Sequence, residues 1–253
     1  METPLQQDWR DPTAPAEFAS EGYSDQLIFH ILDHGEDTVD NVRELGKWCV
    51  LNGQEVNFYV LDWAAWGHDY GYFQYKDLSD AEKERWPSRE KYAAAMTRAR
   101  MEALGAPEDV IAQVEEAIWS TELGVECTTQ EGRILRQADL QNVGSKDVVD
   151  FLRNTVKLFK EERFLEGKPT NIFKLPEFVA FCHKQFKALS IYNAENVSLG
   201  DFDQASNGMS LLSVASAPNI ANLLPRRIQS LYENIGSLLF KDQVETLSDP
   251  EQD

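Results

Sequence analysis

Residues 61–69 read Leu61-Asp62-Trp63-Ala64-Ala65-Trp66-Gly67-His68-Asp69, an apolar run that ends in a histidine and an aspartate side by side. Apolar residues at three- and four-residue steps have the period of an α-helix. Neighbouring side chains on an ideal helix diverge by about 100°, so His68 and Asp69 need a local bend to point the same way. Gly67 and Gly71 permit that bend. The stretch therefore predicts a helix whose end presents an imidazole and a carboxylate together.

Two further polar residues lie in apolar helical patterns elsewhere in the chain. His34 follows the run 29–33, Phe-His-Ile-Leu-Asp, and Asp139 follows the run 134–138, Ile-Leu-Arg-Gln-Ala. An unpaired carboxylate in an apolar helix costs several kcal/mol or takes up a proton, and a bound cation removes that cost. We therefore expect His34, His68, Asp69 and Asp139 to converge from separate helices on one divalent metal ion.

The chain as a whole is predicted to be all-α, because no sustained two-residue alternation appears. Residues 1–22, rich in Pro, Gln and Asp, are expected to form a flexible arm ahead of a single domain over 23–240. Helix signals and caps place helices at 24–30, 38–51, 55–68, 88–104, 107–120, 129–143 and 145–165. Two later helices, at 176–191 and 218–240, flank a long loop at 194–217, and 241–253 is an acidic tail.

The charge of the chain restricts its partners. Its 43 Asp and Glu against 24 Lys and Arg give a formal net charge of −19. This disfavours nucleic-acid polymers and anionic membrane surfaces, because binding to them depends on neutralising phosphates. A small phosphorylated substrate stays open, since a bound metal and a few arginines can reverse the potential within one site.

Cysteine usage and hydropathy predict a cytoplasmic protein. Cys49, Cys127 and Cys182 are odd in number and widely spaced, which is typical of reduced thiols rather than of a disulfide framework. The N-terminus has no basic, apolar leader, and no stretch approaches the roughly 18 apolar residues that span a bilayer. A homodimer stays open, although no heptad pattern compels one.

The order of the four candidate ligands resembles that of the HD-domain superfamily of metal-dependent phosphohydrolases, in which one His, a His-Asp doublet and a distant Asp follow one another. The resemblance rests on His34 with Thr38-Val39 after it, on residues 65–71 (Ala-Trp-Gly-His-Asp-Tyr-Gly) and on residues 137–144 (Gln-Ala-Asp-Leu-Gln-Asn-Val-Gly). Small soluble members often carry an acidic residue before a Ser/Ala-rich helix, a Leu-Gly break and an Ile-x-x-Thr helix end. Here these places are taken, in the same order, by Glu90 before Ala93-Ala94-Ala95, by Leu104-Gly105 and by Ile118-Trp119-Ser120-Thr121. The similarity covers about residues 24–165.

This resemblance implies an HD-domain-like helical bundle with additional C-terminal helices and a metal site built by His34, His68, Asp69 and Asp139. Mixed nitrogen and oxygen ligation suits Mn, Fe, Co, Zn or Mg. Two-metal members carry further histidines between the doublet and the last Asp, and this chain has none there, so one metal ion is expected. The implied activity is cleavage of a small phosphate ester by a metal-activated water. Nucleotides are the leading substrate class, and phosphomonoesters are preferred to diesters.

Three residues are the candidates for catalysis: Asp69 itself, His30 and Glu90. His30 precedes His34 by four residues, which would place both on one face of a helix. The spacing resembles the cyclic-nucleotide phosphodiesterase branch, where the earlier His faces the leaving group, although a purely structural His30 is an equal reading. Glu90 could hold or deprotonate the attacking water, or it could only favour the dipole of its helix.

Three basic residues are candidates for substrate binding. Arg136 lies three residues before Asp139, hence on the same helix face, and could bind a phosphate bidentately or form a surface salt bridge. Arg133 and Lys146 are weaker candidates at the rim. Two other function classes stay open: a catalytically silent HD-fold protein that binds a nucleotide or a partner, and an iron-dependent oxygenase.

Overall fold

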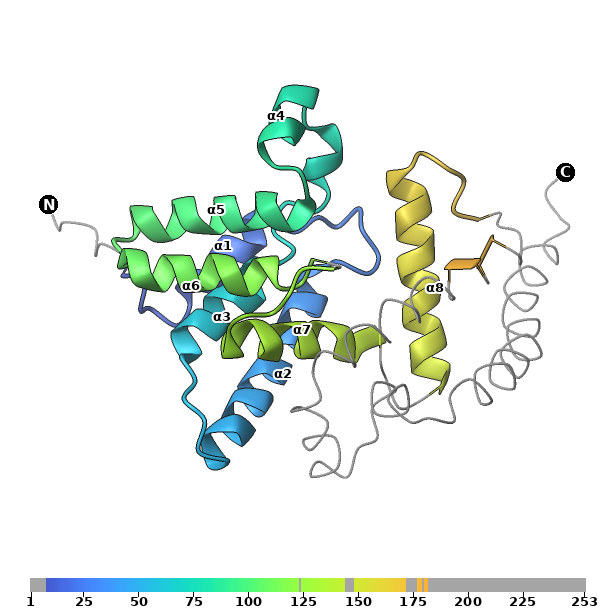
Figure 1. Cartoon of the computed structure of the whole chain (residues 1–253). Helices are drawn as coiled ribbons and strands as arrows, with labels where there is room; N and C mark the ends of the chain where they lie inside the picture. Colours follow the sequence, from blue (N-terminus) through green and yellow to red (C-terminus); the bar gives the residue numbers. More distant parts are fainter. Residues whose placement is uncertain (1–7, 123, 144–147, 172–176, 179, 182–253) are drawn as a thin grey trace, which may run out of the picture.

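A computed structural model describes residues 8–122, 124–143, 148–171, 177–178 and 180–181 of the chain. Every regular element within these residues is a helix (Figure 1), which confirms the predicted all-α class. The helices are α1 (Ala14–Gly22), α2 (Leu32–Leu51), α3 (Phe58–Gly67), the 3-10 turn η1 (Gln74–Asp77), α4 (Asp80–Arg85), α5 (Arg89–Ala103), α6 (Glu108–Trp119), α7 (Gln130–Val143) and α8 (Val148–Leu165). The predicted loop 194–217, the helix 218–240 and the tail 241–253 lie outside the described residues, as does most of 176–191.

Short-range chemistry sets several helix ends close to their predicted positions. The side chain of Asn57 accepts a hydrogen bond from the backbone N of Tyr59 at 3.2 Å and begins α3. Ser88 accepts from the backbone N of Lys91 at 3.2 Å and begins α5. These caps satisfy N–H groups that have no partner within the helix. Their residue types are visible in the sequence, so the boundaries were predictable.

Helix α3 lies at the centre of the fold and contacts α1, α2, α5, α6 and α7. Its residues Leu61, Ala64 and Ala65 are fully buried, and Trp63 is 1% exposed. A helix that is apolar over most of its surface needs such an enclosed place, and its one charged residue, Asp62, pairs with Arg43. Burial of a side chain such as Leu61 stabilises the fold by about 1.5–3 kcal/mol. The end of α3, where His68 and Asp69 follow, is therefore fixed by the core itself.

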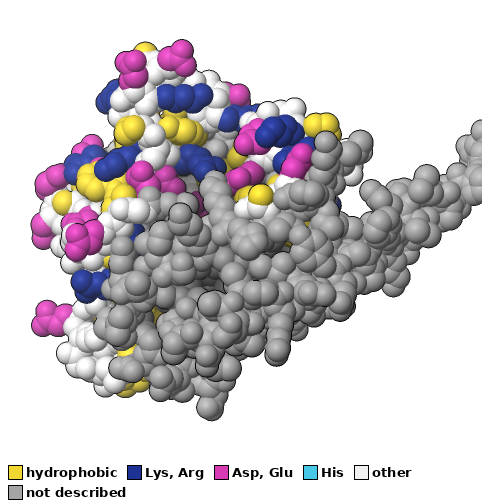
Figure 2. Space-filling model, turned by 45° about the vertical axis from the view of Figure 1, so that its right-hand side comes forward, with side chains coloured by type: hydrophobic (Ala, Val, Ile, Leu, Met, Phe, Trp, Pro, Cys, Tyr) yellow, Lys and Arg dark blue, Asp and Glu magenta, His cyan; other side chains and the backbone are white. Residues whose placement is uncertain are grey.

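Acidic and basic side chains are interspersed on the surface, as Figure 2 shows for one face of the described part. Some of them pair between helices. Arg98 of α5 lies 2.6 Å from Glu115 of α6, and Arg43 of α2 donates to Asp62 of α3 at 2.9 Å. Exposed ion pairs contribute about 0–1 kcal/mol each, so these contacts align neighbouring helices more than they stabilise the fold. No helix in the described part of the chain is both long and apolar enough to cross a membrane.

The prediction of a flexible arm over residues 1–22 is wrong for residues 8–22, which pack on the core. Phe18 of α1 is 3% exposed, and its ring stacks on Tyr70 with centroids 4.1 Å apart. The backbone O of Trp9 accepts a hydrogen bond from the indole of Trp63 at 2.9 Å. Pro15 lies in the first turn of α1, where a missing N–H costs nothing.

The predicted helix at 24–30 is also wrong: residues 24–31 form turns and bends, and α2 begins at Leu32. The backbone N–H groups of Ile28, Phe29 and His30 all donate to one oxygen, Oε2 of Glu161 in α8, at 3.0, 2.8 and 3.0 Å. A set of successive N–H groups that converge on an anion replaces the helical ladder here. A contact across 131 residues thus overrides the local helix signal, and His30 and His34 do not share a helix face.

Candidate metal centre

Four side chains from three parts of the fold meet at one point. His34 lies in the first turn of α2, His68 and Asp69 follow α3 directly, and Asp139 lies near the end of α7. The Nε2 atom of His34 is 3.3 Å from Oδ2 of Asp69 and 3.3 Å from Oδ1 of Asp139. The Nε2 atom of His68 is 3.0 Å and 3.6 Å from the same two oxygens. The structure thus brings together the four residues that the sequence singled out.

The spacing of these donor atoms suits a divalent cation. Two ligand atoms at about 2.1 Å from an ion are about 3.0 Å apart when they subtend a right angle and about 3.4 Å apart in a tetrahedron. The observed separations between imidazole nitrogens and carboxylate oxygens run from 3.0 to 3.6 Å. The groups His34, His68, Asp139 and His30, His34, Asp69 each offer donor atoms within 4.8 Å of one another. These side chains could therefore hold a metal ion.

Two donor atoms of the centre lack a hydrogen bond within the described part of the chain. Nε2 of His68 and Oδ2 of Asp69 are buried and make none. Each buried polar atom in that state costs about 1–3 kcal/mol. A cation removes this cost for both atoms at once, which is the second reason that the donor set fits a metal.

The orientation of His68 is fixed by the chain. Its Nδ1 atom lies 2.7 Å from the backbone O of Ala65 and donates its proton there, which leaves the lone pair on Nε2 for the centre. The bend expected after the doublet is present, because α3 ends at Gly67 and Gly71 adopts a φ of 70°. Only glycine adopts that conformation without strain, so Gly71 lets the chain turn away directly after the two ligands.

Electrostatics keep both carboxylates charged. Burial by itself would lower the pKa of His34, but Asp139 and Asp69 outweigh burial and raise it to about 9. Burial would likewise lower the pKa of His68, but the nearby carboxylates of Asp69 and Asp139 outweigh burial and raise this pKa well above its usual value. Burial would raise the pKa of Asp69, but His68 and its neighbouring imidazoles hold it well below its usual range. Binding of a divalent cation would release the protons that the two imidazoles hold in its absence.

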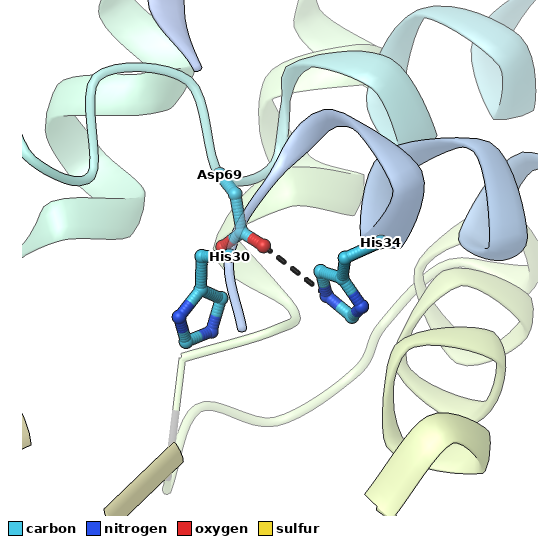
Figure 3. Close-up of side chains that lie close together, drawn as sticks. All are labelled: His30, His34 and Asp69. Atoms are coloured by element: carbon cyan, nitrogen blue, oxygen red, sulfur yellow. Dashed lines mark ion pairs between the residues drawn. The ribbon is translucent and has the colours of Figure 1, made fainter. Parts of the chain in front are cut away.

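His30 lies beside this centre and is held from α8. Its Nδ1 atom is hydrogen-bonded to Oε1 of Glu161, and its ring stacks on Tyr72 with centroids 3.9 Å apart. Figure 3 shows His30 and His34 on opposite sides of the Asp69 carboxylate. The catalytic role predicted for His30 requires such proximity, which here arises from a loop position rather than from a shared helix face.

The other acidic candidate, Glu90, lies half-buried in the first turn of α5. Burial raises the pKa of its carboxyl, and the charges of Glu122 and Asp69 raise it further. Glu90 is therefore near enough to the centre to respond to Asp69. Its predicted role at the attacking water stays a prediction.

The expectation that Arg136 binds substrate is wrong. Its side chain is 1% exposed, and the guanidinium donates to the backbone oxygens of Ser120 and Val125. These contacts join α7 to the segment after α6 and turn the guanidinium away from a ligand. The three-residue spacing between Arg136 and Asp139 correctly placed both residues on one helix. It could not reveal that backbone oxygens elsewhere would accept the protons of Arg136. Arg133, six residues before Asp139, leaves α7 about 120° away from it, and Lys146 lies outside the described residues.

Three residues that the sequence did not single out lie against neighbours of the centre: Glu161 binds His30, Arg89 lies over the ring of Tyr72, and Tyr23 lies against Gly35. Glu161 follows the buried residue Leu158 by three positions, hence on the same helix face, and a carboxylate at such a position could have been recognised from the sequence. The guanidinium of Arg89 lies 4.1 Å from the ring centre of Tyr72. Nothing local marked Tyr23 or Arg89, because their places depend on contacts between distant segments.

Searches of protein-family models, of curated proteins and of solved structures find no match for this chain. The resemblance to the HD-domain superfamily therefore rests on the ordered residues of this sequence alone.

Proposed function

We propose that this protein is a metal-dependent phosphohydrolase that cleaves a small phosphate ester, with a nucleotide as the leading substrate class. The observation that carries the proposal is the donor set of His34, His68, Asp69 and Asp139, whose nitrogens and oxygens lie 3.0 to 3.6 Å apart. When bound, a divalent ion in such a set lowers the pKa of water and screens the phosphoryl oxygens. Mixed nitrogen and oxygen ligation suits Mn, Fe, Co, Zn or Mg.

In this proposal, His30 transfers a proton to the leaving oxygen. Glu161 engages Nδ1 of His30, so Nε2 is the ring nitrogen left to exchange a proton with a ligand. The stacked ring of Tyr72 and the loop fixed by Glu161 hold the imidazole plane, so the proton is delivered in one direction.

Arg89 takes the substrate-binding role that the sequence gave to Arg136. The guanidinium of Arg89 and the imidazole of His30 lie 4.1 and 3.9 Å from the ring centre of Tyr72, so Tyr72 connects Arg89 to the residue beside the centre. Arg89 forms no ion pair with a carboxylate of the described residues, and its planar fork suits bidentate binding of a phosphate. Glu90, the next residue, has the raised pKa that suits a proton acceptor for water.

The proposal is tested by metal content and by phosphate release. The purified wild type, His68→Ala and Asp62→Asn are loaded with manganese, assayed for bound metal, and offered nucleotides and simple phosphate esters with and without a chelator. We expect about one metal ion per chain and chelator-sensitive phosphate release for the wild type. Both should be lost in His68→Ala and kept in Asp62→Asn, because Asp62 pairs with Arg43 on the same helix as the doublet.

Other outcomes separate the alternatives. Bound metal without turnover of any ester would favour a catalytically silent HD-fold protein that binds a nucleotide or a partner. Oxygen consumption by the iron-loaded protein would favour an iron-dependent oxygenase. A wild type that binds no metal would remove the basis of the proposal.

A further inference from the structure

Tyr23 has a buried hydroxyl that serves no purpose within the described part of the chain. The residue follows α1 directly, and its hydroxyl oxygen is buried without a hydrogen bond. A buried polar atom in this state costs about 1–3 kcal/mol. Phenylalanine would fill the same space without that cost, so the hydroxyl is suited to a partner that is not among the described residues.

The hydroxyl reaches the metal centre because of a glycine beside a metal-ligand candidate. Gly35 follows His34, and a Cβ on Gly35 would lie 2.9 Å from the Tyr23 hydroxyl oxygen and 3.4 Å from the ring of Trp66. The first distance is closer than side chains tolerate, so any other residue at this position would push the phenol away. The absence of a side chain at Gly35 thus lets the phenol end lie against the first turn of α2, which also carries His34.

The hydroxyl is a neutral donor under the influence of the centre. Burial raises the pKa of Tyr23 well above 10, and the charges of Asp69 and Asp139 raise it further. The phenol therefore keeps its proton at neutral pH. Its hydroxyl forms no hydrogen bond with either carboxylate. The proton is left for a third group at the same centre.

We propose that Tyr23 donates a hydrogen bond to an oxygen of an anionic group bound at the centre formed by His34, His68, Asp69 and Asp139. Two carboxylates together with one divalent ion leave the centre without net charge, so a neutral donor can add to the binding of an anion without opposing the metal. The identity of that anion as a phosphate rests on the proposed function. Tyr23 is then a substrate-binding residue that the first described segment of the chain contributes to the site.

The test compares Tyr23→Phe with Tyr59→Phe, each of which removes one oxygen atom. Tyr59 is half-exposed and lies at the opposite end of α3 from the doublet. Three quantities are measured for each protein: the melting temperature of the chelated form, the affinity for manganese, and the affinity of the manganese-loaded form for inorganic phosphate. For Tyr23→Phe we expect an equal or higher melting temperature, unchanged manganese binding and about tenfold weaker phosphate binding. Tyr59→Phe should match the wild type in all three.

Each contrary result has a definite meaning. A lower melting temperature for Tyr23→Phe would show that the hydroxyl supports the fold. Loss of manganese would make Tyr23 a metal ligand, and unchanged phosphate affinity with manganese bound would overturn the inference while leaving the proposed hydrolase intact. A wild type without bound manganese would overturn the proposed function, and the inference with it.

Discussion

Glu161 and Asp69 are both buried carboxylates beside a histidine, but the chain treats them differently. Glu161 receives three backbone N–H groups on one oxygen, at 2.8 to 3.0 Å, and the imidazole of His30 on the other. Asp69 faces the Nε2 atoms of His34 and His68 at 3.3 and 3.0 Å, and its Oδ2 accepts no hydrogen bond from the described residues. The hydrogen-bonding capacity of Glu161 is met by the protein, whereas that of Asp69 is left to a ligand.

Within one site, Glu161 therefore has a structural role, whereas Asp69 belongs to the candidate metal centre. Glu161 joins α8 to the loop ahead of α2 and so fixes His30, 131 residues away in the sequence. Among the described residues, no distant backbone N–H donates to Asp69, and its Oδ2 lies where two imidazoles meet. Substitutions at the two positions should therefore fail in different ways: one in stability, the other in its response to metal.

The largest stability effect is expected for Glu161→Ala. Removal of this carboxylate leaves three backbone N–H groups, two of them buried, and the imidazole of His30 without their acceptor, and loss of one partner from a buried polar cluster of this kind costs about 3–5 kcal/mol. The free energy of unfolding, measured by urea denaturation of the chelated protein, should fall by about that amount. Glu166→Ala, an exposed position just beyond α8, should change it by less than about 0.5 kcal/mol. Equal effects for the two variants would refute the structural role of Glu161.

Features that depend on residues close together in the chain were predictable from the sequence. The four donors of the metal centre were predictable because each stands in an apolar helical pattern and their order resembles a known family. The caps Asn57 and Ser88 and the break at Gly105 likewise act within a few residues, and the helices they bound were placed correctly.

The failures share one physical cause, which is a contact between distant segments. The helix expected at 24–30 gives way to a loop because Glu161 binds its backbone. Arg136 points inward because backbone oxygens after α6 accept its protons. The helix α1 forms within a polar, proline-containing stretch because Phe18 and Trp9 find apolar partners on α3 and beside it. The local sequence pattern does not show which distant residues a segment will contact. The structures of these three segments therefore could not be predicted from it.

The second prediction concerns how bound metal changes the free energy of unfolding of variants at Asp69 and Glu161. A ligand present at a hundredfold excess over its dissociation constant stabilises the folded state by about 2.7 kcal/mol. We expect manganese to raise the free energy of unfolding of the wild type by about this amount over the chelated form. Asp69→Asn should lose the increment, because the remaining oxygen of its side chain is a neutral and weaker ligand. Glu161→Gln should be less stable throughout yet keep the increment, and the same loss in both variants would erase the distinction between the two carboxylates.

The smallest effect concerns pH and isolates the charge of Glu161. Burial alone would raise the pKa of its carboxyl, but the hydrogen bond and charge of His30, with the backbone N–H groups of Phe29 and His30, hold it below the ordinary value of 4.5. Because the folded-state pKa is depressed, the charged carboxylate contributes stability that is present above pH 4.5 and is lost as the pH falls through the folded value.

The glutamine variant has no proton to gain at this position. The difference in unfolding free energy between the chelated wild type and Glu161→Gln should therefore narrow between about pH 6 and about pH 3, with the wild type losing its advantage as Glu161 is protonated. Glu166→Gln provides the matched control, since the side chain of Glu166 is exposed and pairs only with the equally exposed Lys168 among the described residues. A constant difference across the range would mean that the backbone donors bind Glu161 equally well in its neutral form, and that shape rather than charge holds the loop of His30 in place.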